Sequence, residues 1–165
     1  MGLSRKFHVQ IKLQRPDYAA GFAPYITLKL MGQLIVTSEI LDDLTSVARR
    51  FVSDIQVEAV PSIQDWCKAI GLPEDNPFLC GKTVQDLQTG LHLVLLAERI
   101  TPEMQASVIS AMEFHAKLPR ENIASLTDPH VFVKHLLLHE VAHATGHDRS
   151  EEECDRWAFQ QLHIA

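Results

Sequence analysis

The stretch that decides the fold is residues 128–155, which read DPHVFVKHLLLHEVAHATGHDRSEEECD. Asp128-Pro129 is typical of a helix start, because a capping side chain precedes a proline at the first helical position, and Gly146 is typical of a helix end. The sequence therefore predicts a helix from about Pro129 to Thr145. Its apolar residues lie nearly all around the helix, which is the pattern of a helix buried in a small domain.

Three polar residues interrupt this apolar helix, namely His139, Glu140 and His143. Residues four apart lie one above the other, so both imidazoles can reach a single ion with Glu140 beside them. Zinc accepts two imidazoles and a third ligand while it leaves one position open to water, and a carboxylate at this place can take a proton from that water. Alternatively, these three are ordinary polar residues of a histidine-rich chain and bind no metal, but a role in solvation does not explain their place in an apolar helix. The spacing predicts a Zn²⁺ site with His139 and His143 as ligands and Glu140 as general base.

Among the candidates for the third ligand, Glu151 is the one that helical geometry favours. If Ser150 caps a last helix, Glu151 shares a face with Asp155, while Glu153 completes a capping box with Ser150. Asp155 is then placed to accept the outer N–H of a ligating histidine and to set its tautomer. Alternatively, Glu151 is a carboxylate in the first turn of the helix whose role is to interact favourably with the helix dipole. His147 is the alternative third ligand, and otherwise a contact to substrate or transition state.

The pattern of a His-Glu-x-x-His helix, a short turn and a Glu151-x-x-x-Asp155 helix resembles the gluzincin-type zincin metallopeptidases, in which the downstream glutamate is the third zinc ligand. The segment from Glu151 to Phe159 resembles the ImmA/IrrE metallopeptidases, and Ala144-Thr145-Gly146-His147 is similar to the ArdC-like antirestriction metallopeptidases. The sequence departs from these families at Cys154, where a small alanine is usual, and in the shortness of the turn. The resemblance is confined to the part of the chain after about residue 129.

This resemblance implies a small α+β zincin-like domain, with a mixed or antiparallel sheet packed against a buried active-site helix. It also implies a zinc-dependent metallopeptidase with a narrow intracellular protein or peptide target. For that reaction we expect a nearby donor such as His147 or Arg149 to stabilise the oxyanion together with the metal. The alternative is a zinc-stabilised regulatory or antirestriction interaction module that hydrolyses nothing. Glu140 favours the enzyme, because a purely structural metal site needs no base there.

Composition limits the remaining possibilities. The chain has 165 residues, of which 46% are hydrophobic and 22% charged, so we expect a single domain over residues 1–165; residues 1–60 are an alternative N-terminal subregion. Apolar runs are too short for a membrane span or signal peptide, and three scattered cysteines indicate a reducing, cytoplasmic setting. The net charge of −6 argues against nucleic acid as the main partner.

Hydrophobic periodicity predicts the other elements. The expected strands are 7–13, 25–30 paired with 34–36, and 91–97, and the expected helices are 38–53, 62–70 and one that begins at Thr101-Pro102 and ends before Pro119. In zincins the strand nearest the zinc helix binds extended substrate at the sheet edge, and we assign this role to either Leu91–Ala97 or Asn122–Leu126.

Overall fold

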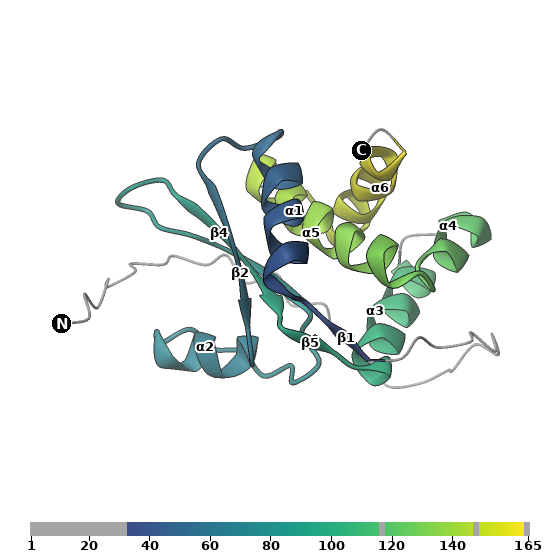
Figure 1. Cartoon of the computed structure of the whole chain (residues 1–165), viewed down its shortest axis with the longest axis horizontal. Coiled ribbons are helices and arrows are strands. Elements are labelled where there is room, and N and C mark those ends of the chain that lie inside the picture. The colour runs from purple at the N-terminus through teal and green to yellow at the C-terminus, as the bar shows by residue number, and fades with distance from the viewer. Residues whose placement is uncertain (1–32, 116–117, 147–148, 164–165) are drawn as a thin grey trace.

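The computed structural model describes residues 33–115, 118–146 and 149–163. These residues form a mixed α+β fold with helices and small sheets, which confirms the expected fold class at that level (Figure 1). In chain order the elements are β1 (Leu34–Ile35), α1 (Ser38–Arg49), β2 (Ile55–Val60), α2 (Ile63–Ala69), β3 (Gly81–Gln85), β4 (His92–Ala97), β5 (Arg99–Ile100), α3 (Pro102–His115), α4 (Arg120–Ser125), α5 (Pro129–Thr145) and α6 (Glu151–Leu162).

The main sheet has the strand order β2-β4-β3. Strand β4 is central and pairs in parallel with β2 and antiparallel with β3, so the sheet is mixed, as expected. Residues 93–97 of β4 are all buried, which explains why this strand is a continuous apolar run rather than an alternating one. A second, two-stranded sheet joins β1 and β5.

Helix α5 lies over this sheet and forms the structural centre of the described fold. It contacts β3 and β4 on one side and α6 on the other, with α1 beside it (Figure 1). The core cluster joins α5 to α1 and to the sheet through buried side chains such as Leu137, Val141, Leu44 and Val94. Because α5 is enclosed on several sides, it is apolar nearly all round.

The predicted helix ends are confirmed where capping residues are present. Asp128 accepts hydrogen bonds from the backbone N–H groups of His130 and Val131, and α5 ends at Thr145 as expected. Ser150 and Glu153 form the expected capping box at the start of α6. Helix α2 begins after Ser62, and α1 stops at Arg49 rather than continuing to residue 53.

Both expectations for the substrate-binding edge strand are wrong. The run 91–97 corresponds to β4, which has a neighbour on each side, and residues 122–125 belong to helix α4. The edge next to α5 is instead β3, a five-residue strand that was not among the predicted elements. Its sequence GKTVQ contains a glycine and three polar residues, so it has little strand signal of its own.

The predicted strands 7–13 and 25–30 lie outside the described residues, as do His147 and Asp148. Among the described residues, no helix combines the length and hydrophobicity that crossing a lipid bilayer requires. The three cysteines, Cys67, Cys80 and Cys154, are buried free thiols.

Candidate metal centre

Three side chains from α5 and α6 converge at one point. The Nε2 atoms of His139 and His143 lie 3.2 Å apart. The Glu151 carboxylate lies 3.0 Å from His139 Nε2 through one oxygen and 3.3 Å from His143 Nε2 through the other. The four-residue spacing on α5 aligns the two imidazoles, and the Ser150 cap sets the first residue of α6, Glu151, opposite them.

This donor set fits zinc in type and in spacing. Zinc–nitrogen bonds of about 2.05 Å in a tetrahedron place the ligand atoms about 3.3 Å apart. The observed separations of 3.0–3.3 Å, in which each Glu151 oxygen faces one imidazole, are close to this spacing, and one ligand atom from each of the three residues lies within 4.8 Å of the others. The Glu151 side chain is 54% exposed, so a fourth, open coordination position would face solvent.

The outer nitrogens of both histidines also have partners on α6. Asp155 Oδ1 lies 2.7 Å from His139 Nδ1, and Cys154 Sγ lies 3.5 Å from His143 Nδ1. A carboxylate at Nδ1 holds the proton there and leaves Nε2 free to bind a metal. Asp155 also lies 3.1 Å from Nε2 of His135, which is 1% exposed and stacks on Phe159.

The same contacts shift the acid–base behaviour of the metal-free site. Burial lowers the pKa of His139, but hydrogen bonds with Asp155 and Glu151 outweigh this effect and raise it well above its usual value. Burial likewise opposes the charge on His143, yet its contacts with Cys154 and Glu151 raise its pKa to about 10. Hydrogen bonds from His139 and then His143 lower the pKa of Glu151. Without metal, these contacts favour the protonated form of the imidazoles and the ionised form of the Glu151 carboxylate.

The Glu140 side chain contacts strand β3 of the sheet. Thr83 of β3 places its Oγ1 2.8 Å from the Glu140 backbone oxygen and 2.8 Å from Oε2 of the Glu140 side chain. The negative charge of Glu140 contributes to the raised pKa values of both neighbouring histidines, after the larger effects of burial and hydrogen bonding. The carboxylate thus lies within electrostatic range of the metal-binding atoms and against the edge strand.

Arg149, one of the two residues expected to stabilise an oxyanion, is held by the end of α5. Its guanidinium donates hydrogen bonds to the Ala142 carbonyl at 3.4 Å and the Thr145 hydroxyl at 3.1 Å, and it lies over the Trp157 ring. These contacts give Arg149 a role in closing the turn between α5 and α6. The other expected residue, His147, lies outside the described residues.

The sequence pattern therefore predicted the converging residues but missed two of their contacts. It named His139, Glu140, His143, Glu151 and Asp155, which the structure brings together or places beside one another. It missed the contacts of Thr83 with Glu140 and of His135 with Asp155. His135 lies four residues before His139 on α5, so helical spacing is a signal that could have found it, but no local pattern links Thr83 to a residue 57 positions later.

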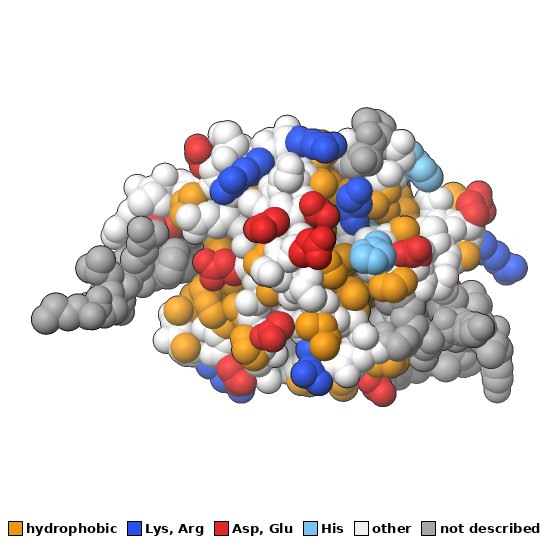
Figure 2. All heavy atoms as spheres, in the orientation of Figure 1, with side chains coloured by type: hydrophobic (Ala, Val, Ile, Leu, Met, Phe, Trp, Pro, Cys, Tyr) orange, Lys and Arg blue, Asp and Glu red, His pale blue; other side chains and the backbone are white. Residues whose placement is uncertain are grey.

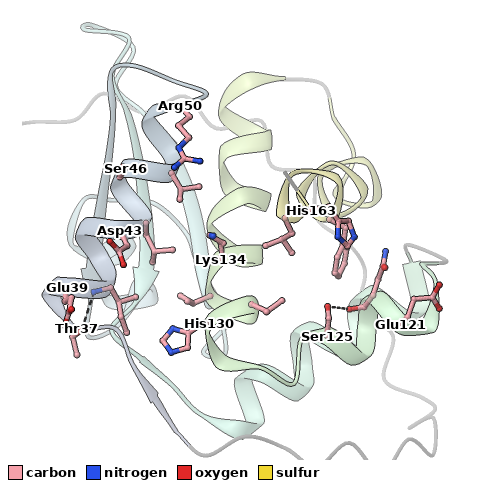
Figure 3. Close-up of a pocket in the computed structure, with 18 residues that line it drawn as sticks. Thr37, Glu39, Asp43, Ser46, Arg50, Glu121, Ser125, His130, Lys134 and His163 are labelled. Atoms are coloured by element: carbon pink, nitrogen blue, oxygen red, sulfur yellow. Dashed lines mark hydrogen bonds between the residues drawn. The ribbon is translucent and has the colours of Figure 1, made fainter. Parts of the chain in front are cut away.

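A groove of about 990 Å³ lies away from this centre, between α1, α4, α5 and the end of α6. Figure 3 shows Glu39 and Asp43 of α1 on one side of it and His130 and Lys134 of α5 on its floor. On the corresponding face of the molecule, acidic side chains gather over α1 (Figure 2). Lys134 lies about 140° around α5 from His139. Among the described residues that line the groove, none belongs to the candidate metal centre.

Comparison of the chain with protein-family models, curated proteins and solved structures found no match. Two imidazoles and a carboxylate converge, the Nδ1 atom of one imidazole is held by a second carboxylate, and a third carboxylate lies beside them. This arrangement defines a candidate metal-binding site.

Proposed function

We propose that the protein is a zinc-dependent metallopeptidase in which His139, His143 and Glu151 bind the ion and Glu140 acts as general base. The observation that carries the proposal is the convergence of three metal-binding side chains within 3.0–3.3 Å of one another, with Asp155 holding the Nδ1 atom of His139. A structural zinc site is usually closed by four protein ligands, whereas three ligands and a solvent-facing position suit hydrolysis.

Each residue has a separate part in this chemistry. When bound, zinc would supply a Lewis acid that makes water a stronger acid and polarises a carbonyl. Glu140 accepts the proton from the attacking water and returns it to the leaving amine. Asp155 keeps the His139 imidazole in the tautomer and orientation that leave Nε2 available.

An extended peptide is the substrate shape that the surroundings favour. Ala97 N–H donates to the Cys80 carbonyl, and Asp86 N–H donates to the Leu91 carbonyl, which sets the alternation of hydrogen bonds along β3. In an antiparallel pair, the intervening non-bonded positions direct their N–H and C=O groups away from the partner strand. Positions 81, 83 and 85 of β3 therefore face outward at the edge beside Glu140, where a peptide can add as a further strand.

Metal content and cleavage of a mixed peptide pool test this proposal together. We expect one zinc ion per chain in the wild type. Glu140→Gln should retain the zinc and lose activity by about 10²- to 10⁴-fold, because a positioned general base contributes that much. Glu151→Ala and His143→Ala should lose zinc, while His130→Ala, on the groove side of α5, should retain both zinc and activity.

The outcomes separate the alternatives. Zinc that is lost with His147→Ala but retained with Glu151→Ala would overturn the ligand assignment and leave the enzyme class intact. Stoichiometric zinc without cleavage would support the zinc-stabilised interaction module instead. A protein that binds no zinc would contradict both functions.

A further inference from the structure

The edge strand β3 makes a direct contact with the proposed general base. Thr83 Oγ1 lies 2.8 Å from Glu140 Oε2, and the same hydroxyl lies 2.8 Å from the Glu140 backbone oxygen. Among the described residues, Thr83 is the one side chain that hydrogen-bonds the Glu140 carboxylate. A hydroxyl has one proton to donate, so these two acceptors compete for it.

Gly81 lies two residues earlier on the same face of β3. Because it has no side chain, it leaves room for the Glu140 carboxylate. A Cβ atom at position 81 would lie 3.0 Å from Glu140 Oε1 and 3.1 Å from Glu140 Cγ. Position 81 is buried, and its φ is not among the positive values that favour glycine. The close approach of the Glu140 side chain, rather than backbone conformation, is therefore the reason for glycine at this position.

We propose that Thr83 and Gly81 position the general base: the Thr83 hydroxyl holds Oε2 of Glu140, and the bare surface at Gly81 accommodates the other carboxylate oxygen. This inference rests on the proposed function and extends it to two residues of the sheet. Thr83 is a positioning residue, because it acts through Glu140 and not on the reacting atoms.

This arrangement links substrate docking to the base. The backbone of Thr83 lies at an outward-facing position of the edge, where a peptide would pair, while its side chain holds Glu140. Thr83→Val preserves the backbone edge and the β-branched shape but removes the hydroxyl. It should therefore leave substrate docking intact and misplace only the base.

Steady-state kinetics of the zinc-loaded full chain on a cleaved peptide test the inference. We expect Thr83→Val to lower kcat by about 10- to 100-fold with KM within about twofold, because small misplacements of a reacting group are costly. Thr83→Ser should restore most of kcat. Gly81→Ala should lower kcat in the same way, and zinc affinity should stay unchanged in all three variants.

Lys82→Met is the matched control, because Lys82 lies on the same strand but binds Glu74 on the opposite face of the sheet. It should leave kcat unchanged. A wild-type kcat in Thr83→Val, or an equal loss of kcat in Lys82→Met, would overturn the positioning role. If Glu140→Gln were fully active, the proposed function would fail first.

A double-mutant cycle in the metal-free protein tests the same contact without activity. The free energies of unfolding of Thr83→Val, Glu140→Ala and the double variant should be non-additive if the hydroxyl holds the side chain. Additive effects would show that Thr83 serves only the Glu140 backbone oxygen, and would overturn the inference whether or not the protein cleaves peptides. If Thr83→Val folds poorly, Thr83→Ser is the second variant. It keeps the hydroxyl, so its coupling energy with Glu140→Ala should equal that of the wild-type threonine.

Discussion

Two neighbouring residues of α6, Cys154 and Asp155, each contact the Nδ1 atom of a different histidine. The Asp155 contact is short, at 2.7 Å, and involves a charged acceptor, whereas the Cys154 thiol lies 3.5 Å from its partner. Hydrogen bonds to charged groups are stronger and more restrictive than those to a thiol. His139 is therefore more firmly oriented than His143 before any metal binds.

Asp155→Ala should lower zinc affinity by about 10- to 100-fold, the usual effect of removing a group that orients a metal-binding histidine. Cys154→Ala should have a smaller effect, because the contact that it removes is longer and weaker. Competition with a chelator of known affinity measures both. Equal losses in the two variants would contradict the difference between the two contacts.

The pKa values of the histidines predict a pH dependence. In the folded metal-free protein the pKa of His143 is raised to about 10 and that of His139 is raised well above its usual value. A histidine whose pKa is higher in the folded state than in the unfolded state stabilises the fold. This stabilisation is fully present below the unfolded-state pKa of about 6.5 and is lost as the pH rises through the folded-state pKa. The metal-free protein should therefore lose stability between about pH 7 and pH 10, which thermal unfolding in the presence of a chelator measures.

Zinc binding should show the opposite trend, because the ion displaces protons from both imidazoles. Zinc affinity should rise with pH, by up to about two orders of magnitude per unit while both histidines remain protonated in the free protein. Chelator competition at several pH values between 6.5 and 8.5 measures this slope. An affinity independent of pH would mean that the free histidines are already neutral.

At the scale of elements, the turn between α5 and α6 determines whether Glu151 reaches the histidines. Arg149 closes this turn through the Ala142 carbonyl and the Thr145 hydroxyl, and it lies over Trp157, which itself packs edge-on against Phe51. A Cβ atom on Gly146 would lie 2.7 Å from Arg149 Nε. Gly146 thus ends α5 and also leaves room for the arginine that joins the two helices.

Gly146→Ala should displace Arg149 and cost about 1–3 kcal/mol of stability, from the loss of two weak hydrogen bonds and an exposed cation–π contact. Arg149→Ala should cost a similar amount by removing the same contacts. The double variant should be little worse than either single one, since both act on one arrangement. Additive losses in urea unfolding would contradict this shared cause.

At the scale of the whole molecule, a bound metal would link α5 to α6 across one of the two most extensive contacts between elements in the described fold. Helix α5 in turn packs on the sheet whose edge, β3, carries Thr83. The proposed zinc site and the proposed base therefore draw on helix, turn and sheet together.

Removal of zinc should lower the melting temperature. Binding at about a thousand times Kd contributes about 4 kcal/mol, which corresponds to a shift on the order of 10 °C for a domain of this size. Calorimetry with and without a chelator measures the shift. The shift should disappear in His143→Ala and persist in His130→Ala; a shift of equal size in both would place the stabilising metal elsewhere.

Several features follow from the sequence alone because their causes are local. Asp128-Pro129 and Gly146 delimit α5, Ser150 and Glu153 start α6, and the four-residue spacing aligns His139 with His143. Capping and helical periodicity act over a few residues, so the linear sequence contains them. The apolar run that forms β4 predicts a strand for the same reason.

Other features exist only after the chain has folded. The five-residue β3 becomes the sheet edge because β4 pairs with it, and Thr83 becomes the partner of Glu140 because α5 packs on that edge. The separation of 57 positions between these two residues leaves no periodic signal. Residues 122–126, expected as a strand, form most of α4 and its C-cap, since so short a segment takes its structure from its neighbours. The sequence determined the chemistry of the candidate ligands, and tertiary packing decided which side chains orient them.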